Sequence, residues 1–257
     1  MDNESRKVRQ LRLSEKSIAI VLLVIIVIGV LPLLAISFYN RPASDDFGYS
    51  TLTARAWRES GSVAEVVSAA VERVKLSYQG WQGTFSAVFL FALPLSIFSW
   101  NLYFASTFVL VGSLILSTLY FLHVVLVKAF RLSKWVWLTA SLGVLLLSME
   151  MLPAASEAFF WHNGGMFYTF FYSLQLFWLG LALKLPFPSR RGTARLRVVL
   201  LMLLSVVLGG GNYTTALTSC ILMFALAAAG IYRKSPFKWH CLASLVLVLG
   251  SLIVSAV

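Results

Sequence analysis

The chain of 257 residues is 59% hydrophobic and only 12% charged, with a mean hydropathy of +0.84. These values exclude a soluble globular domain and indicate a polytopic membrane protein. The formal net charge of +11 does not indicate nucleic acid as a partner, because the basic residues form short clusters between apolar runs, as topology signals do. We therefore expect an all-α transmembrane helical bundle whose main partner is the lipid bilayer.

The N-terminal stretch "MDNESRKVRQLRLSEK" contains five basic residues and precedes the first apolar run. That run is longer than the core of a signal peptide and has no clear small-residue cleavage site. Residues 1–16 are therefore predicted to form a cytoplasmic tail, and residues 17–38 an uncleaved first span. The rest of the chain, 17–257, is expected to be one multi-pass bundle in a bacterial inner (plasma) membrane.

A polar loop at 39–80 follows the first span. Its segment 62–75 places Val63, Val66, Ala70 and Val74 at nearly helical spacing, with charged residues between them. This pattern predicts one or two extracytoplasmic, juxtamembrane amphipathic helices, broken near Gly61. The alternative is a surface helix that only packs on the bundle.

Further apolar segments follow the loop and bring the total to roughly seven or eight. They cover about 81–99, 103–127, 135–153, 164–185, 196–210, 213–232 and 238–257. If the basic connectors 128–134, 184–197 and 232–238 are cytoplasmic, the positive-inside rule places loop 39–80, segment 154–163 and the turn at 209–213 on the opposite face.

Two apolar segments, 81–99 and 103–127, lie between an outer loop and an inner connector, where the number of crossings must be odd. Either one of them re-enters or lies in the interface, or the connector 128–134 is outside despite its charge. We favour the first alternative, with Pro94 and the "SWN" break at 99–101 as the irregular point. The last apolar run reaches Val257 without a polar exit, so we expect the chain to be a fragment or truncated product of a longer protein.

Acidic residues are scarce in this chain, and two of its ten stand side by side in "FYNRPASDDFGYS". Asp45 and Asp46 are flanked by Arg41 and Tyr49. Such a pair can hold a divalent cation such as Mg²⁺ or Mn²⁺ through its oxygens. Alternatively, one carboxylate acts as the general base on a hydroxyl group. A third reading is structural, with Ser44 or Asp45 capping a helix that starts near Asp46.

A second polar and aromatic stretch is "PAASEAFFWHNGGMFYTFFY", residues 153–172. Glu157, Trp161, His162 and Tyr168, together with Asn163, are suited to a sugar or a lipid headgroup. The alternative is an interfacial aromatic belt hinged at its two glycines.

Two shorter stretches complete the candidate site. "YQGWQGTFS" (78–86) adds Trp81 and Gln82, and "LGGGNYTTA" (208–216) adds Asn212. For the three glycines of the second stretch, a tight interhelical turn is favoured over a phosphate loop.

The order of "ASDDFGY", "YQGWQGTFS" and "EAFFWHNGGMFY" after a first span resembles the GT-C superfamily of polytopic glycosyltransferases, over roughly residues 17–215. The resemblance implies transfer of a sugar from a polyprenyl-phosphate donor to a glycan, lipid or protein acceptor outside the cytoplasm. It implies that Asp45 and Asp46 serve as base or metal contact, with Glu157, Trp161 and Tyr168 around donor or acceptor.

Two positions depart from the pattern of the family. Thr84 stands where related proteins often have an Arg, and Asn212 where they have a carboxylate, and either change weakens the expectation of phosphate binding or catalysis. Two other classes therefore remain open: a transporter or flippase of lipid-linked glycans, and a non-catalytic membrane subunit or fragment.

Overall fold

The computed structural model describes residues 14–257, so most of the predicted cytoplasmic tail (residues 1–13) lies outside the described residues. This part of the chain is all-α, with eleven α-helices and no strand, which confirms the expected class. The α-helices are α1 Glu15–Ser37, α2 Asp45–Ser60, α3 Val63–Gly80, α4 Phe85–Phe91, α5 Ala105–Leu122, α6 Lys134–Glu150, α7 His162–Gly165, α8 Phe171–Leu183, α9 Arg191–Gly209, α10 Tyr213–Tyr232 and α11 Lys238–Ala256. Two 3₁₀ turns (η1 Leu95–Ile97, η2 Trp100–Leu102) and three π-helical turns (η3 His123–Ala129, η4 Ser156–Phe160, η5 Met166–Phe170) complete the list.

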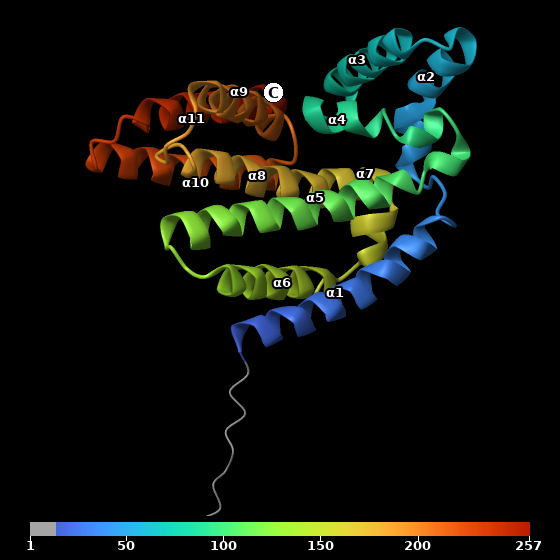
Figure 1. The fold of residues 1–257 in the computed structure, drawn as a ribbon. Helices are drawn as coiled ribbons and strands as arrows, with labels where there is room; N and C mark the ends of the chain where they lie inside the picture. The colour runs from blue at the N-terminus through green and yellow to red at the C-terminus, as the bar shows by residue number, and fades with distance from the viewer. Residues whose placement is uncertain (1–13) are drawn as a thin grey trace, which may run out of the picture.

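The long helices lie side by side and are joined alternately at two ends (Figure 1). Within residues 14–257, six helical segments are long and apolar enough to cross a membrane. α6, with 17 residues, is slightly shorter but lies beside α1 and α5 and runs from one end to the other (Figure 1). We call the end that contains connectors 129–134, 184–190 and 233–237 the basic end. The loop end contains α2–α4, segment 151–161 and the turn 210–212.

The segment 81–99 does not cross the bundle, as the parity of the predicted crossings required. Its helix α4 has only 7 residues, about 10 Å at 1.5 Å per residue. The chain then passes Pro94 and two 3₁₀ turns and starts α5 from the same loop end (Figure 1). The predicted irregular point at Pro94 and the break at 99–101 is confirmed.

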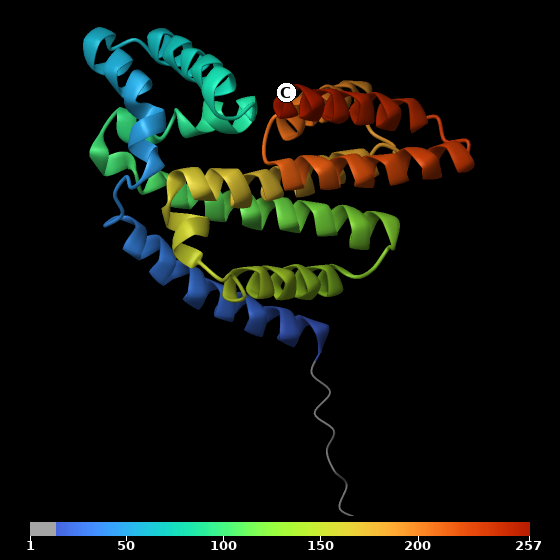
Figure 2. The ribbon, with the colours of Figure 1, turned by 180° about the vertical axis from the view of Figure 1, so that it is seen from behind.

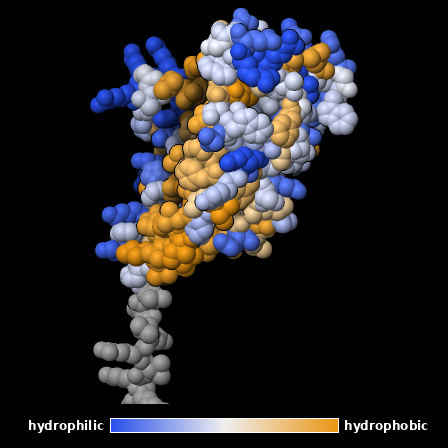
Figure 3. Space-filling model, turned by 90° about the vertical axis from the view of Figure 1, so that its right-hand side faces the viewer, coloured by the Kyte–Doolittle hydropathy of each residue, from blue (hydrophilic) through white to orange (hydrophobic). Residues whose placement is uncertain are grey.

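The polar loop forms the two helices that its pattern predicted. α2 ends at Ser60, and Gly61 takes a left-handed conformation with φ of 62° before α3 begins. Glycine adopts this backbone geometry without a Cβ clash, which explains why the break falls there. The view from the loop end shows a cluster of hydrophilic residues at the top, the level of α2 and α3 in Figure 1, and a mixed surface below it whose largest hydrophobic patch is at the lower left (Figure 3).

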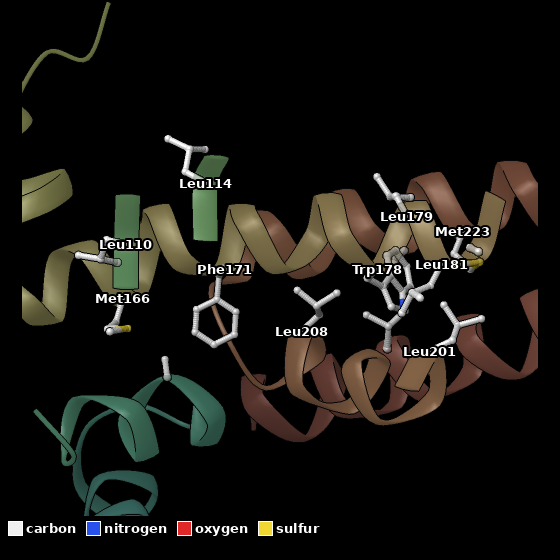
Figure 4. Packing of buried hydrophobic residues seen from close by; sticks show 14 of the residues in the cluster. Leu110, Leu114, Met166, Phe171, Trp178, Leu179, Leu181, Leu201, Leu208 and Met223 are labelled. Carbon is white, nitrogen blue, oxygen red and sulfur yellow. The ribbon is translucent and has the colours of Figure 1, made fainter. Parts of the chain in front are cut away.

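The core of the bundle forms where α8 packs on α5, α9 and α10. Phe171 and Trp178 are fully buried on α8 and point towards Leu208 and Leu201 of α9 (Figure 4). Seen from behind, α10 and α11 continue the bundle beside α8 and α9 (Figure 2). Lipid tails are as apolar as these side chains, so packing and interhelical hydrogen bonds, more than the hydrophobic effect, hold such helices together.

The three glycines between α9 and α10 form a tight turn, as predicted. A methyl group on Gly210 would meet the ring of Phe85, and one on Gly211 the ring of Phe171. The Gly210 carbonyl accepts a hydrogen bond from the backbone N–H of Ser86 at 2.8 Å. The turn therefore supports the start of α4 and fixes the depth at which α4 enters the bundle.

Candidate functional site

A cavity of 250 Å³ at the loop end brings together residues from four separate stretches of the sequence. We call it the amide cavity. Eight residues that the sequence analysis singled out line it, so the loop before α3 and the segment after α6 contribute to one cavity. Its lining consists of Asp45, Tyr49, Trp81, Gln82, Phe91, Glu157, Trp161, Asn163, Gly164, Phe167 and Tyr168.

A second hollow of 330 Å³ shares Asp45, Tyr49 and Trp81 with the amide cavity. We call it the arginine hollow, after Arg73, which lines it together with Gly48, Leu76 and Ser77. Because three residues belong to both linings, the two hollows lie next to each other, on either side of Asp45, Tyr49 and Trp81.

The two adjacent aspartates lie in different surroundings. Asp45 is exposed and lines both hollows, whereas Asp46 is fully buried. The Asp46 carboxylate accepts hydrogen bonds from Tyr103 Oη, from Ala43 N at 3.1 Å and from Asn163 N at 3.2 Å. Asp46 therefore has no free oxygen facing the cavity, and of the pair only Asp45 is placed to meet a substrate.

This arrangement does not fit a divalent cation held between the two aspartates. Three donors already occupy the oxygens of Asp46, while a hard cation needs free oxygen ligands. Among residues 14–257 no group of three or more His, Cys, Asp or Glu is placed to hold a metal ion.

The expected helix cap takes another form. α2 begins at Asp45, but the Ser44 side chain makes no capping hydrogen bond, and the bond from Ala43 N to Asp46 takes that place.

Besides Asp46, three predicted residues lie outside the lining of the amide cavity. His162 uses both ring nitrogens, with Nδ1 2.9 Å from Ser106 Oγ and Nε2 3.1 Å from the Leu90 carbonyl. Asn212 caps α10 by accepting a hydrogen bond from Thr215 N at 3.1 Å. Arg41 donates to the carbonyls of Phe38 and Asn40. Their polar atoms serve the fold of the loop end.

Arg73 is a site residue that the sequence patterns did not reveal. Its guanidinium carbon lies 4.7 Å from the centre of the Tyr49 ring, a cation–π contact, and its buried Nε has no hydrogen-bond partner. In the sequence it looks like its neighbours Glu72 and Lys75, which form an exposed ion pair. Only the orientation of α3 in the folded protein shows that Arg73 faces the site.

Tyr49 is held between Arg73 and the ring of Phe91, whose centre is 5.1 Å away. Its hydroxyl accepts a hydrogen bond from Gln82 Nε2 at 2.9 Å. Burial raises the pKa of Tyr49 and nearby Asp45 raises it further, against the lowering effects of Arg73 and of the Gln82 hydrogen bond. Tyr49 therefore stays protonated and offers its O–H as a donor.

The wall opposite α2 contains buried polar groups without partners. Asn163 is only 3% exposed, yet neither its side-chain nitrogen nor its oxygen has a hydrogen-bond partner, and the same holds for Trp161 Nε1. Gly164 makes room for this wall, because a methyl group there would meet the Trp161 ring. Native proteins rarely leave buried amides unpaired, so this wall offers hydrogen-bond donors and an acceptor to a molecule in the cavity.

An apolar groove of 420 Å³ lies near these hollows, between α3–α4 and the bundle. It neighbours them along the chain: Val74 follows Arg73, and Leu90 precedes Phe91. Its lining is formed by Val71, Val74, Phe85, Ser86, Phe89, Leu90, Phe170 and Val207.

No protein-family model, no curated protein and no solved structure matches the chain. The chemistry of the site therefore rests on its geometry. It offers two carboxylates, unpartnered amide, indole and guanidinium groups, aromatic faces and a nearby apolar groove. Paired donors and acceptors beside aromatic rings recognise the hydroxyl groups and ring faces of sugars.

Proposed function

We propose that this protein is an integral-membrane glycosyltransferase of the GT-C kind. It transfers a sugar from a polyprenyl-phosphate donor to a glycan, lipid or protein acceptor. The observation that carries the proposal is the amide cavity: Asp45 and Glu157 share it with the unpartnered amide of Asn163 and the aromatic rings of Trp81 and Tyr168.

Asp45 is the proposed general base, because it lines both hollows and so stands where donor and acceptor would meet. In the proposed step, an acceptor hydroxyl oxygen forms a bond to the anomeric carbon of the sugar, and the bond from that carbon to the phosphate oxygen breaks. The phosphate leaves on its lipid with the bonding electrons, and Asp45 takes the hydroxyl proton.

The arginine hollow suits the phosphate of the donor. Arg73 has a free Nε in a partly buried site, and guanidinium groups bind phosphate oxygens strongly. Thr84, which replaces the Arg expected from the family, is fully buried at the start of α4. Arg73 supplies the positive charge from a different helix.

The apolar groove suits the first isoprene units of the carrier. Its lining is almost entirely hydrocarbon and it lies beside the re-entrant α4. The basic end is assigned to the cytoplasm and the loop end to the outer face by the positive-inside rule. Because the residues of the aspartate pair do not fit a cation, no step of the proposal passes through a metal.

A transporter would need polar groups at mid-membrane that are free to meet cargo. The largest polar group buried within α8, Gln175, contacts Thr215, Thr218 and Ser219 of α10. These contacts favour the enzyme over the transporter.

The test is the formation of polyprenyl phosphate within proteoliposomes supplied with a panel of polyprenyl-phosphate pentoses and hexoses and soluble glycoside acceptors. Asp45→Asn should lower the transfer rate by about 10³-fold, within the range of a lost general base. Glu59→Gln is the matched control, because Glu59 is an exposed acid on the same helix that pairs with Arg55. Equal rates for Asp45→Asn and the native protein would remove the proposed base and, with it, the proposal.

A further inference from the structure

Asp46 joins three segments that are far apart in the sequence. Its Oδ2 accepts from Ala43 N and Tyr103 Oη, and its Oδ1 accepts from Asn163 N. Tyr103 is itself fully buried, and its hydroxyl oxygen accepts a hydrogen bond from His162 N at 2.9 Å. The carboxylate of Asp46 and the hydroxyl of Tyr103 thus bind the first two backbone N–H groups of α7 to the first turn of α2.

The segments joined in this way form the opposite walls of the amide cavity. The start of α2 carries Asp45 and Tyr49, while Asn163 lies in α7, and Glu157 and Trp161 lie in the segment that leads into α7. The separation of the two walls therefore depends on bonds that Asp46 makes beneath the floor of the cavity.

Asp46 also constrains the backbone next to Asp45. Ser44 has a φ of 50°, a left-handed value that is unfavourable for a residue with a Cβ. The residues on either side of this strained position are tied to each other, because Ala43 N donates to the Asp46 carboxylate and Asp46 N donates to the Ala43 carbonyl at 3.1 Å. The backbone on both sides of Asp45 is held by its neighbour.

We propose that Asp46 is a positioning residue. Its buried carboxylate locks the first turn of α2 to the start of α7 and so sets the place of Asp45 against the sugar-binding wall. The lock itself is independent of the reaction, whereas its effect on catalysis rests on the proposed glycosyltransferase function.

The variants that test the lock are Asp46→Asn and Tyr103→Phe. In Asp46→Asn, an NH₂ group replaces one carboxylate oxygen, so a donor faces the N–H or O–H groups that now donate to that oxygen. In Tyr103→Phe, the hydroxyl that bridges Asp46 and His162 N is lost. Thr53→Val is the matched control, because Thr53 is equally buried on α2 and its hydroxyl donates to the Ala92 carbonyl at 2.6 Å without touching Asp46.

The first measurement is hydrogen–deuterium exchange of the native full chain and the three variants in detergent. Asp46→Asn and Tyr103→Phe should speed exchange in segments 43–49 and 162–166 together, by roughly tenfold, because a buried bond lost in one segment frees both. The double variant should add little to either single change, since the two groups act as one unit. Thr53→Val should leave segment 162–166 unchanged.

Two outcomes overturn the lock: faster exchange in only one of the two segments, or the same pattern in Thr53→Val. If Asp46→Asn fails to fold, Tyr103→Phe decides alone, because it leaves the carboxylate and its two backbone bonds in place.

The second measurement separates positioning from bulk stability. On the proposed transfer reaction, Tyr103→Phe should raise KM for the polyprenyl-phosphate sugar by roughly fivefold at equal amounts of folded protein, since displaced walls weaken contacts with the substrate. A purely structural role would lower the amount of folded enzyme and leave KM unchanged, which contradicts the positioning role. If the native protein transfers no sugar, the proposed function fails, while the exchange data still decide the lock.

Discussion

Two buried amides on neighbouring helices differ in one respect. Gln175 of α8 is 7% exposed and its Nε2 lies within 3.1 Å of acceptors on Thr215, Thr218 and Ser219. Asn163 of α7 is 3% exposed and its side chain has no partner. The paired amide joins two helices of the bundle, whereas the unpaired amide lines the amide cavity.

More than half of the unpaired polar atoms in the described chain lie at the site, and the others are on Thr84, Ser141 and His240. Seven buried side-chain atoms within residues 14–257 have no partner, and four of them are on Arg73, Trp161 and Asn163. All three residues line the two hollows at Asp45. The unpaired polar groups thus concentrate at the loop end, where the proposed substrates would supply the missing partners.

The largest effect within this comparison is expected from Arg73→Gln. Loss of a charge-assisted hydrogen bond should weaken binding of undecaprenyl phosphate by about 30-fold, with little change in stability. The affinity is measured as binding of undecaprenyl phosphate to the detergent-solubilised protein. Arg55→Gln, which removes an exposed charge from α2, should bind as the native protein does, and equal binding by Arg73→Gln would remove the guanidinium from the site.

Asn163→Leu tests the unpartnered amide directly. Leucine has a similar volume and needs no hydrogen bond, so the unfolding temperature should stay equal or rise. KM for the sugar donor should increase by about tenfold, because the sugar loses a donor and an acceptor. A lower unfolding temperature with an unchanged KM would instead make Asn163 part of the fold.

Gln175→Leu should show the opposite pattern. Removing the amide breaks its contacts between α8 and α10 and should lower the free energy of unfolding by about 1 kcal/mol, as for other polar contacts between membrane helices. Transfer kinetics per folded molecule should not change. A large effect on KM with no loss of stability would break the division between fold and site.

The smallest effect concerns pH. Burial and Asp45 raise the pKa of Tyr49 above its ordinary value of 10.0. In the unfolded chain this tyrosine ionises at lower pH than in the folded protein, so its contribution to stability is present below pH 10 and is lost as the pH rises through the raised pKa. Thermal unfolding between about pH 9 and 12 should therefore be less pH-dependent for Tyr49→Phe than for the native protein. An identical pH dependence would show that Tyr49 is not the group concerned.

Sequence patterns predicted the fold well where the signal was local. Gly61 marked the break between α2 and α3, and Pro94 marked the segment that does not cross, because each residue restricts its own backbone. The patterns also predicted that Asp45 and Glu157 share one face, since crossing parity and basic connectors determine which loops meet.

The sequence patterns did not show which side of each helix faces the site. Adjacent residues on a helix point about 100° apart, so Asp45 faces the cavity while Asp46 points into the protein. Arg73 and Glu72 likewise face different sides of α3. Which of the two faces the site depends on how α3 packs against α2, and the sequence alone does not give that packing. The sequence suggested His162 as a substrate-binding residue, but its ring nitrogens are occupied by groups on Ser106 and Leu90, which no spacing rule predicts.

The apolar groove determines which concentration of a lipid-linked substrate the protein would respond to. A carrier that keeps its isoprene chain between α3–α4 and Val207 never leaves the plane of the bilayer. It reaches the hollows by lateral diffusion in two dimensions, and its effective concentration is its mole fraction among the surrounding lipids rather than its molarity. The protein then responds to the composition of its membrane, whatever the volume of water around it.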